Sequence, residues 1–219
     1  IAVDDGSTDD SLKILRDWVT KLPLRIVELA HSGSPAGPRN HGIEMATSDY
    51  VFFLDADDVW HPRKLEIQVR EMQKNGSFVM SCHERIVSTS HIFPSFDETK
   101  VSTRELSLND FIIKNRCSTP TVMVRKSINE RYQNDKRHAE DYLLWMEIIA
   151  NHGNALFIRS PLTSCTNPIY GGSGLSGSFT AMQKGELDAF RTLRQRGHLS
   201  LGKFLMATMW SSIKFVIRI

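Results

Sequence analysis

Three aspartates within four positions are the residues of this chain best suited to chemistry. Asp55, Asp57 and Asp58 follow directly on the apolar run of residues 50–54. Carboxylates this close repel one another, and a divalent cation held on oxygen ligands relieves the repulsion most simply. The alternative is an acidic turn in which Asp58 caps a helix that Pro62 opens. The cation site is the favoured interpretation of the pattern.

A second acidic pair stands near the start of the chain. Asp4 and Asp5 come after an apolar segment and before Gly6 and Ser7. A carboxylate at such a turn can accept hydrogen bonds from the imide N–H of a pyrimidine base or from ribose hydroxyls. The alternative is stabilisation of the following helix by capping and by charge at its N-terminus. For Asp5, which directly precedes the Gly6 turn, the ligand interpretation is favoured.

Two further charged positions have two interpretations each. Arg39 stands near the start of a predicted helix, where it could bind a phosphate or carboxylate, or could bridge to the Asp55 cluster. Glu140 and Asp141 lie in the first turn of another predicted helix. From the sequence alone, stabilisation of the helix dipole is the favoured use of that pair.

Alternating strand and helix patterns predict the scaffold that positions these residues. Apolar runs at 1–3, 24–29, 50–54 and 78–82 are separated by helical patterns, at about 39–46 and 62–74 among others. This rhythm predicts an α/β fold with a mostly parallel sheet and helices on both faces. The run 50–54 is apolar enough for the middle of the sheet, so the acids are expected at its carboxyl edge, where such sheets bind ligands.

The remainder of the chain is less regular. Residues 84–103 predict a hairpin or inserted loop, 106–114 a short helix and 119–124 a strand. A periodic helix is expected at 139–150, short strands at 156–158 and 162–166, and two closing helices at 180–196 and 199–218.

Composition restricts the class of protein. The chain has 219 residues, which suits one domain with an appendage. Its net charge of only +2 argues against binding of nucleic acid by general electrostatic attraction. Three cysteines (Cys82, Cys117 and Cys165) lie far apart, which favours a reducing compartment and argues against a disulfide framework or zinc site. The chain opens with Ile1 inside an apolar segment, so it is expected to be a fragment.

Four motifs together resemble the family 2 glycosyltransferases of GT-A fold. They are, in order, Asp4-Asp5-Gly6-Ser7-Thr8-Asp9, Pro38-Arg39-Asn40-x-Gly42-Ile43, Phe53-Leu54-Asp55-Ala56-Asp57-Asp58-Val59-Trp60 and Glu140-Asp141-Tyr142-x-x-Trp145. Each is weak alone, but their order and spacing over residues 1 to 150 match the family. The family's first strand and helix are expected before Ile1 and are absent.

The resemblance implies an inverting, metal-dependent transferase that uses a nucleotide-diphosphate sugar, most often a UDP-sugar. By this similarity Asp4, Asp5, Ser7, Arg39 and Asp55 bind the nucleotide sugar. Asp55, Asp57 and Asp58 supply the Mn²⁺ or Mg²⁺ ligand, and which of the three binds ribose instead is left open. Asp141 is the implied general base.

The resemblance also implies a product and an organisation. The reaction is addition of a sugar to a hydroxyl of a glycan or polyprenyl-diphosphate-linked acceptor in cell-surface polysaccharide synthesis. The GT-A domain is expected over 1–166 and a Gly/Ser loop, a candidate lid, over 167–179. A helical tail follows over 180–219.

The tail suggests a location. Residues 180–219 carry seven Lys or Arg against two acids, a net +5, and Lys203, Lys214 and Arg218 fall on one face of an otherwise apolar helical pattern. Such a helix suits the surface of an anionic membrane, which places the protein peripherally at the inner face of the cytoplasmic membrane. The alternative is a helix packed on the domain with its cations exposed.

Two other functions fit parts of the pattern. A phosphatase of haloacid dehalogenase type also ends an apolar strand with Asp-x-Asp, with Asp55 as nucleophile, but it has no role for Gly6-Ser7-Thr8. A non-catalytic domain that binds a nucleotide sugar or a partner is the second alternative.

Overall fold

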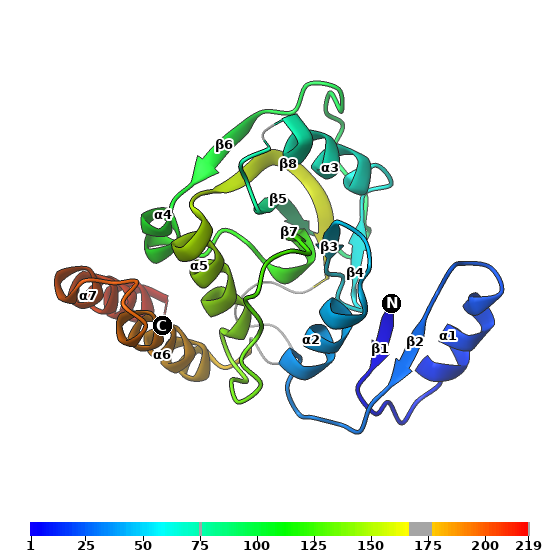
Figure 1. Ribbon diagram of the computed structural model, residues 1–219, viewed down its shortest axis with the longest axis horizontal. Coiled ribbons are helices and arrows are strands. Elements are labelled where there is room, and N and C mark those ends of the chain that lie inside the picture. Colours follow the sequence, from blue (N-terminus) through cyan, green and yellow to red (C-terminus); the bar gives the residue numbers. More distant parts are fainter. Residues whose placement is uncertain (75, 167–176, 219) are drawn as a thin grey trace.

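The computed structural model describes residues 1–74, 76–166 and 177–218. Within them strands and helices alternate, as expected for an α/β protein (Figure 1). The strands are β1 (Ala2–Asp4), β2 (Ile26–Glu28), β3 (Tyr50–Phe52), β4 (Asp58–Trp60), β5 (Met80–Val87), β6 (Thr103–Leu106), β7 (Met123–Arg125) and β8 (Ala155–Cys165). The helices are α1 (Ser11–Val19), α2 (Ala36–Met45), α3 (Lys64–Lys74), α4 (Leu108–Ile113), α5 (Glu140–His152), α6 (Phe179–Gln195) and α7 (Leu201–Arg218), with one 3₁₀ turn at Thr119–Thr121.

The main sheet is mixed, which corrects the expectation of a mostly parallel sheet. Its strand order is β3-β7-β5-β8-β4, with β6 also paired to β8. Among the described residues only β5 and β8 run parallel in it, and the other pairings are antiparallel. A parallel pair needs a long crossover, which here passes through α4 and α5. The sequence shows those helices but does not show which strands return antiparallel.

Strand β3, which leads into the three aspartates, lies at the end of this strand order and not in its middle. Its apolar character has another cause, because both of its faces are covered. Val51 and the following Phe53 belong to the cluster around α5, whereas Tyr50 and Phe52 pack with Met72 of α3. Alternate side chains of one strand point to opposite faces, so burial by helices on both sides gives a continuous apolar run.

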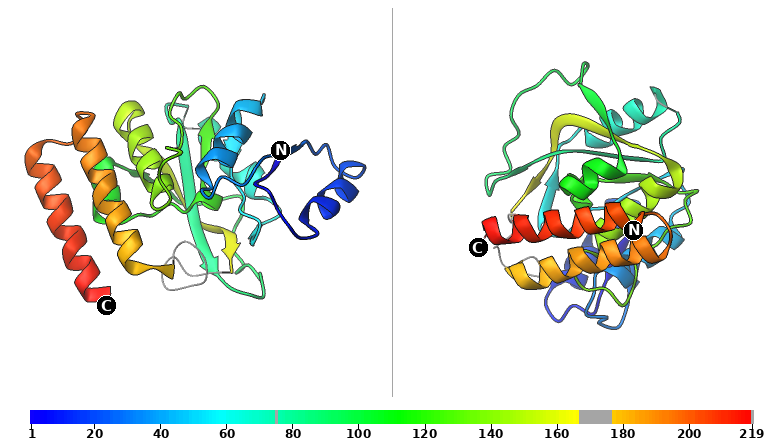
Figure 2. Two further views of the ribbon diagram at one scale, coloured as in Figure 1. Left: turned by 90° about the horizontal axis from the view of Figure 1, so that it is seen from below. Right: turned by 90° about the vertical axis from the view of Figure 1, so that its left-hand side faces the viewer.

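The largest core cluster is centred on α5. Trp145 of this helix is fully buried, and its ring contacts Phe53 and Tyr132 at centroid distances of 5.7 Å each. Helix α6 packs against α5, and α7 packs against α6, so the two last helices form a layer beside the sheet domain (Figure 2). The core therefore holds the segment that ends at Asp55 against the helix that begins at Glu140.

The first three elements form a small unit of their own. β1 and β2 make a separate parallel pair joined through α1, at the edge of the molecule in Figure 1. α1 begins at Ser11 with Asp10 at its N-cap. β1 packs on α2, where Val3 approaches Gly42.

The structure joins Cys82 of β5 to Cys117 in a disulfide, with Cα atoms 5.9 Å apart. The prediction against disulfides is therefore wrong for this pair. The two cysteines are 35 residues apart, and only the fold brings the segment after α4 against β5. Cys165 is free and buried.

The C-terminal helices match the two predicted ones, but the predicted basic stripe does not face outward as a whole. Lys214 donates to Glu186 of α6 at 2.7 Å and is only 13% exposed, whereas Lys203 is exposed. The side chain of Arg218 and the candidate lid at 167–176 lie outside the described residues. No helix in the described ranges is long and apolar enough to cross a membrane.

We expect Trp145→Ala to lower the free energy of unfolding by about 3–5 kcal/mol, because it removes a fully buried ring from the cluster that supports Phe53. Urea unfolding followed by circular dichroism measures the change. Trp18→Ala is the matched control, since that ring is 46% exposed and its removal should cost less than about 1 kcal/mol. Equal losses in the two variants would contradict the packing described here.

Candidate active site

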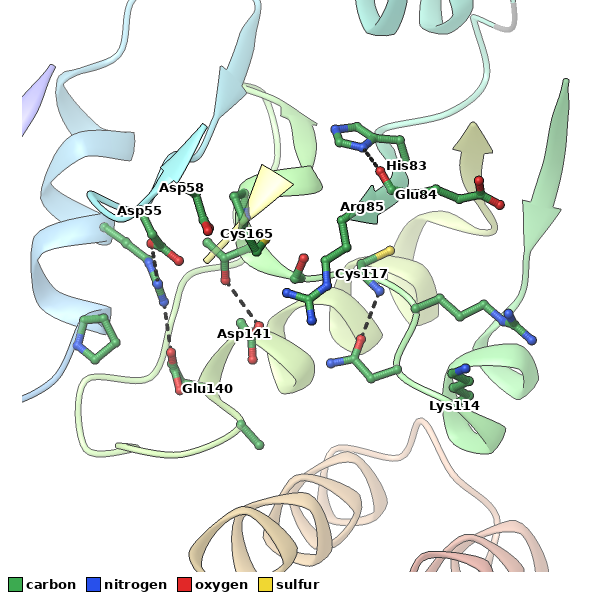
Figure 3. Close-up of a pocket in the computed structure, with 18 of the residues that line it drawn as sticks. Asp55, Asp58, His83, Glu84, Arg85, Lys114, Cys117, Glu140, Asp141 and Cys165 are labelled. Carbon is green, nitrogen blue, oxygen red and sulfur yellow. Dashed lines mark hydrogen bonds and ion pairs between the residues drawn. The ribbon is translucent and has the colours of Figure 1, made fainter. Parts of the chain in front are cut away.

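A cavity of about 860 Å³ opens where the Asp55 turn, the start of α5 and the ends of β5, β6 and β8 meet. Figure 3 shows Asp55 and Glu140 at one side of it and Lys114 at the other, with Asp141 and Arg85 between them. The carboxylates that line it are Asp55, Asp57, Asp58, Glu84, Glu140 and Asp141. The structure thus brings together the acids of two predicted motifs that are more than 80 positions apart.

Arg39 joins these two motifs directly. From α2, its guanidinium donates to Asp55 Oδ1 at 2.8 Å and to Glu140 Oε1 at 2.9 Å. It also lies over the Tyr132 ring, 5.4 Å from the centroid. Burial alone would lower the pKa of Arg39, but the charges of Asp55 and Glu140 raise it above its ordinary value. The expected bridge to the Asp55 cluster is confirmed, and Glu140 is a second anchor that the sequence did not predict.

Glu140 and Asp141 occupy different environments although they are neighbours. Burial, followed by the charge of Asp141, raises the pKa of Glu140 to about 7, despite the opposing effect of Arg39. Burial also raises the pKa of Asp141. Asp141 Oδ1 accepts from the Tyr142 N–H at 2.7 Å, and Oδ2 accepts from the Thr119 hydroxyl at 3.2 Å. A carboxylate that is held in place, lines a cavity and has a raised pKa is suited to accept a proton.

The backbone before these two acids is held in an uncommon conformation. Ala139, the N-cap of α5, has a φ of 56°, in the left-handed region that non-glycine residues rarely adopt. The preceding His138 carbonyl lies against Gly185 of α6, where an added Cβ would stand 2.7 Å from the carbonyl oxygen. The close contact with α6 therefore fixes the turn that aims Asp141 into the cavity.

The acidic turn after β3 is compact. The Asp58 N–H donates to the Asp55 carbonyl at 3.1 Å, and Asp58 then begins β4. Helix α3 begins only at Lys64, so Asp58 is not its cap and that interpretation is excluded. Burial raises the pKa of Asp58, and the charges of Asp57 and Asp55 raise it further. Repulsion among these carboxylates favours a bound cation.

The donor set of this turn fits Mg²⁺ or Mn²⁺ shared with a substrate. Among the described residues, no three His, Cys, Asp or Glu side chains converge as an all-protein metal site. Mg²⁺ commonly binds through one or two carboxylates together with substrate phosphates, and the Asp55–Asp58 turn supplies such carboxylates at the cavity wall.

The structure does not bring Asp4, Asp5 and Ser7 into this cavity. Asp4 accepts from the N–H groups of Gly6 and Ser7, at 3.1 and 3.0 Å. Hydrogen bonding from the Ser7 side chain, and after it from these N–H groups, lowers the pKa of Asp4. Asp5 accepts from the Ser32 N–H at 3.0 Å and lies 3.2 Å from His31 Nδ1. Gly6 is required there, because its φ is 77° and an added Cβ would stand 2.9 Å from the His31 nitrogen.

Several lining residues were not singled out from the sequence. Thr119 holds Asp141, and cations from three strands line the far wall. They come from the region 84–125, which the sequence leaves irregular, and from β8. The local sequence of such a region does not indicate whether an Arg or Thr side chain points into a cavity, so these residues are identified only from the fold.

Comparison with known proteins agrees with the motifs. Residues 1–133 match the family model described as "Glycosyl transferase family 2". The chain is 28% identical over 149 residues to UDP-Glc:alpha-D-GlcNAc-diphosphoundecaprenol beta-1,3-glucosyltransferase WfgD of Escherichia coli, covering 68% of this chain and 56% of that protein. It is 30% identical over 157 residues to the poly(ribitol-phosphate) beta-N-acetylglucosaminyltransferase TarS of Staphylococcus aureus, covering 69% of this chain and 27% of that protein. The chain thus spans about half, or less, of these relatives.

Solved structures share the fold. S. aureus TarS 1–349 in complex with UDP-GlcNAc matches with a TM-score of 0.69 and 20% identity, over 87% of this chain and 56% of that one. The mannosyltransferase PcManGT of Pyrobaculum calidifontis, in complex with GDP-Man and Mn²⁺, matches with a TM-score of 0.60 and 16% identity, over 88% and 54% of the two chains. The predicted α/β fold of GT-A type, with a sheet flanked by helices and helices at the C-terminus, is confirmed.

The raised pKa of Glu140 predicts how stability depends on pH in the absence of divalent cations. The ordinary pKa of a glutamate is 4.5, and that of Glu140 in the native protein is about 7. Between these two pH values Glu140 holds a proton in the native protein that it has lost in the unfolded chain. The free energy of unfolding should therefore fall as pH rises through this window, by on the order of 3 kcal/mol. Glu140→Gln should flatten that fall in urea unfolding curves measured from pH 4.5 to 7.5. Glu44→Gln, at an exposed position of α2, is the control and should keep the wild-type slope.

Proposed function

The chain belongs to glycosyl transferase family 2, and from this membership we propose that it transfers a sugar from a nucleotide-diphosphate sugar, in particular a UDP-sugar, to a hydroxyl group with inversion. The acceptor is a glycan or lipid-linked glycan of cell-surface polysaccharide synthesis, the kind named for the E. coli relative. The observation that carries the proposal is one cavity in which Arg39 ties the Asp55 turn to the helix that presents Asp141.

Asp141 is the proposed catalytic base. An inverting transfer needs the acceptor hydroxyl to lose its proton as its oxygen attacks the anomeric carbon opposite the leaving diphosphate. Asp141 Oδ2 is the proposed proton acceptor, because Thr119 holds it and the cavity exposes it to an incoming hydroxyl. The Tyr142 N–H fixes the other oxygen, which limits rotation of the carboxylate. If donor and acceptor bind on either side of Asp141, the entropy cost of bringing them together is met by binding, which lowers the activation barrier.

The Asp55–Asp58 turn is the proposed diphosphate end of the donor site. Asp57 and Asp58 would hold Mn²⁺ or Mg²⁺, and Asp55, with one oxygen fixed by Arg39, would face the ribose. When bound, such an ion neutralises the charge that develops on the leaving diphosphate. The Mn²⁺ complex of the P. calidifontis structure supports the choice of ion.

Asp4, Asp5 and Ser7 are proposed to complete the nucleotide side. They lie outside the cavity in this structure, but β1 packs on α2, the helix that carries Arg39. Asp5 already accepts two hydrogen bonds from Ser32, from its N–H and its hydroxyl at 3.0 and 3.1 Å. A base or ribose that binds Asp5 would replace these hydrogen bonds with its own. Because the number of bonds would not increase, Asp5 is expected to contribute modestly to affinity for the nucleotide.

We also propose that α7 rests on the inner face of the cytoplasmic membrane. Its inner side packs on α6 through Ala207 and Ser211, which are fully buried. Its outer side exposes eight large apolar side chains: Leu201, Leu205, Met206, Met209, Trp210, Ile213, Val216 and Ile217. Lys203 is exposed on the same helix, and an apolar face of this length beside an exposed cation is typical of helices that lie in a lipid interface. A lipid-linked acceptor would be reached there without leaving the membrane surface.

Asp141→Asn tests the proposed base. We expect kcat for sugar transfer to fall about 10²- to 10⁴-fold, because the amide cannot take the proton. Binding of UDP in Mn²⁺, followed as a shift in melting temperature, should persist. Asp17→Asn, at an exposed position of α1, is the control and should leave both readouts unchanged. Full transfer by Asp141→Asn would remove Asp141 from the mechanism, and UDP binding without transfer in the unsubstituted chain would indicate a non-catalytic binding domain.

Met209→Glu with Ile213→Glu tests the membrane surface. These charges should weaken binding to anionic phosphatidylglycerol vesicles at least about tenfold in a co-sedimentation assay, because they oppose burial of two apolar side chains. The control pair Ile14→Glu with Val19→Glu changes two similarly exposed positions on α1 and should sediment like the unsubstituted chain. If the α7 pair instead dissociates an oligomer and vesicle binding is unchanged, the surface contacts protein and the membrane proposal is wrong.

A further inference from the structure

The wall of the cavity that faces away from the Asp55 turn is basic. Besides Arg39, the cationic side chains that line the cavity are Arg85, Arg104, Lys114, Arg116, Arg137 and Arg159. Within the described residues none of these six forms a salt bridge with a carboxylate, whereas Arg39 forms two. Arg85 is the one whose charge acts on Asp58 and that hydrogen-bonds the Cys165 side chain. Like charges that converge repel one another, and a bound anion relieves that repulsion.

The fold holds this basic wall in place before any ligand arrives. Arg104 of β6 pairs with Phe157 of β8, and its guanidinium lies over that ring, 5.4 Å from the centroid. Arg159 follows Phe157 by two residues on β8, which directs it to the same face of the strand. A guanidinium stacked on a ring loses less freedom when it binds an oxyanion, which favours this arrangement for recognition.

A covalent link adds the second part of the wall. Lys114 and Arg116 come from the segment after α4, and the disulfide from Cys117 to Cys82 ties this segment to β5. β5 also carries Arg85, which Figure 3 shows pointing into the cavity beside Asp141. The acids on this side are few. Glu84 lines the cavity, and Asp110 feels the charges of Arg104 and Arg116 but is already bound in a capping box with Ser107.

The positions of Arg104, Arg159, Lys114 and Arg116 separate them from the donor, whereas Arg85 lies close enough for its charge to act on Asp58. The donor diphosphate has its own cation site at the Asp55 turn, on the other side of Asp141 in Figure 3. In an inverting transfer the acceptor reaches the base from the side opposite the leaving group. The cations therefore lie where the acceptor must enter, and the anion they bind belongs to the acceptor.

We propose that the acceptor carries a phosphate or diphosphate group, and that Arg104 and Arg159 bind it with help from Lys114 and Arg116. This inference rests on the proposed transferase function and specifies its acceptor. Guanidinium groups recognise phosphate oxygens through paired, charge-assisted hydrogen bonds. With the phosphate held at this wall, the acceptor sugar next to it would place its hydroxyl at Asp141.

Calorimetric titration of the full chain with inorganic pyrophosphate and with farnesyl diphosphate in EDTA tests the site. EDTA removes divalent cations, so the carboxylate turn repels these probes and only the basic wall can bind them. We expect both diphosphates to bind and farnesol to bind much more weakly. Equal affinity of the two diphosphates would support recognition of the phosphate alone, and tighter binding of farnesyl diphosphate would support recognition of a lipid diphosphate. Farnesol binding as tight as that of farnesyl diphosphate would overturn the proposal.

Arg104→Gln with Arg159→Gln should weaken diphosphate binding about 100-fold, about tenfold for each charge-assisted contact. Arg104→Lys with Arg159→Lys should retain part of it. Arg16→Gln with Arg191→Gln removes two exposed arginines elsewhere and is the matched control. Lys114→Gln with Arg116→Gln, at two exposed positions, gives an independent test if the first pair does not fold. Unchanged diphosphate affinity in both Gln pairs would contradict the assignment.

Binding of UDP in Mn²⁺ to the same variants separates this inference from the proposed function. It should stay within about twofold, since the donor binds across Asp141 from these cations. A loss of UDP affinity equal to the loss of diphosphate affinity would assign the cations to the donor and overturn the inference. Failure of the unsubstituted chain to bind UDP at all would instead count against the transferase function, while the diphosphate titration would still test the basic wall.

Discussion

The ion-pair bridge made by Arg39 is the interaction on which the arrangement of this site depends. It connects the turn after β3 to the first turn of α5, two segments whose residues are separated by 85 positions, through a side chain from α2. Tyr132 covers the guanidinium, and Trp145 and Phe53 pack behind it. A planar group with several fixed donors can serve two carboxylates at once, which an ammonium on a flexible stem does less well. The bridge therefore sets the width of the cavity as well as its charge.

One arginine does not neutralise all the acids around it, and this shortfall gives them different properties. Asp55 and Glu140 share the guanidinium, yet the pKa of Glu140 still rises to about 7, and the pKa values of Asp58 and Asp141 also rise. Burial is the first cause in all three. The shortfall at the Asp55 turn favours an added cation, whereas at Asp141 it favours an added proton. Burial together with this excess of negative charge thus underlies the metal site proposed at one point and the proton transfer proposed at the other.

The sequence was sufficient for what depends on neighbouring residues and insufficient for what depends on distant ones. The helices at the Arg39 and Asp141 motifs were predictable from local sequence patterns, although neither has a side chain that caps its N-terminus. So was the acidic turn, since it requires only the sequence from Asp55 to Asp58. The strand order was not, and neither was the disulfide between Cys82 and Cys117, because no local pattern records which strands lie side by side. The ion pair of Glu140 with Arg39 could not be predicted either, and the local sequence indicates only that Glu140 stabilises the dipole of its helix. Its partner lies 101 positions earlier and only the fold brings the two together.

The cavity finally shows how one fold keeps opposite charges apart at short range. Most of its carboxylates come from a tight turn and a helix start that Arg39 joins, with Glu84 on β5, whereas five of its cations come from β5, β6, β8 and the segment tied to β5 by the disulfide. If these side chains were on flexible segments, the carboxylates and the cations would form salt bridges with one another. Arg104 is stacked on Phe157, and Asp55 and Glu140 are bound to Arg39, so these three groups cannot pair with one another without breaking contacts that are already made. A site with a fixed acidic side and a fixed basic side can bind two anionic substrates in one orientation, the one through a cation and the other directly. Asp141 lies between the two sides, the position that its proposed role as base requires.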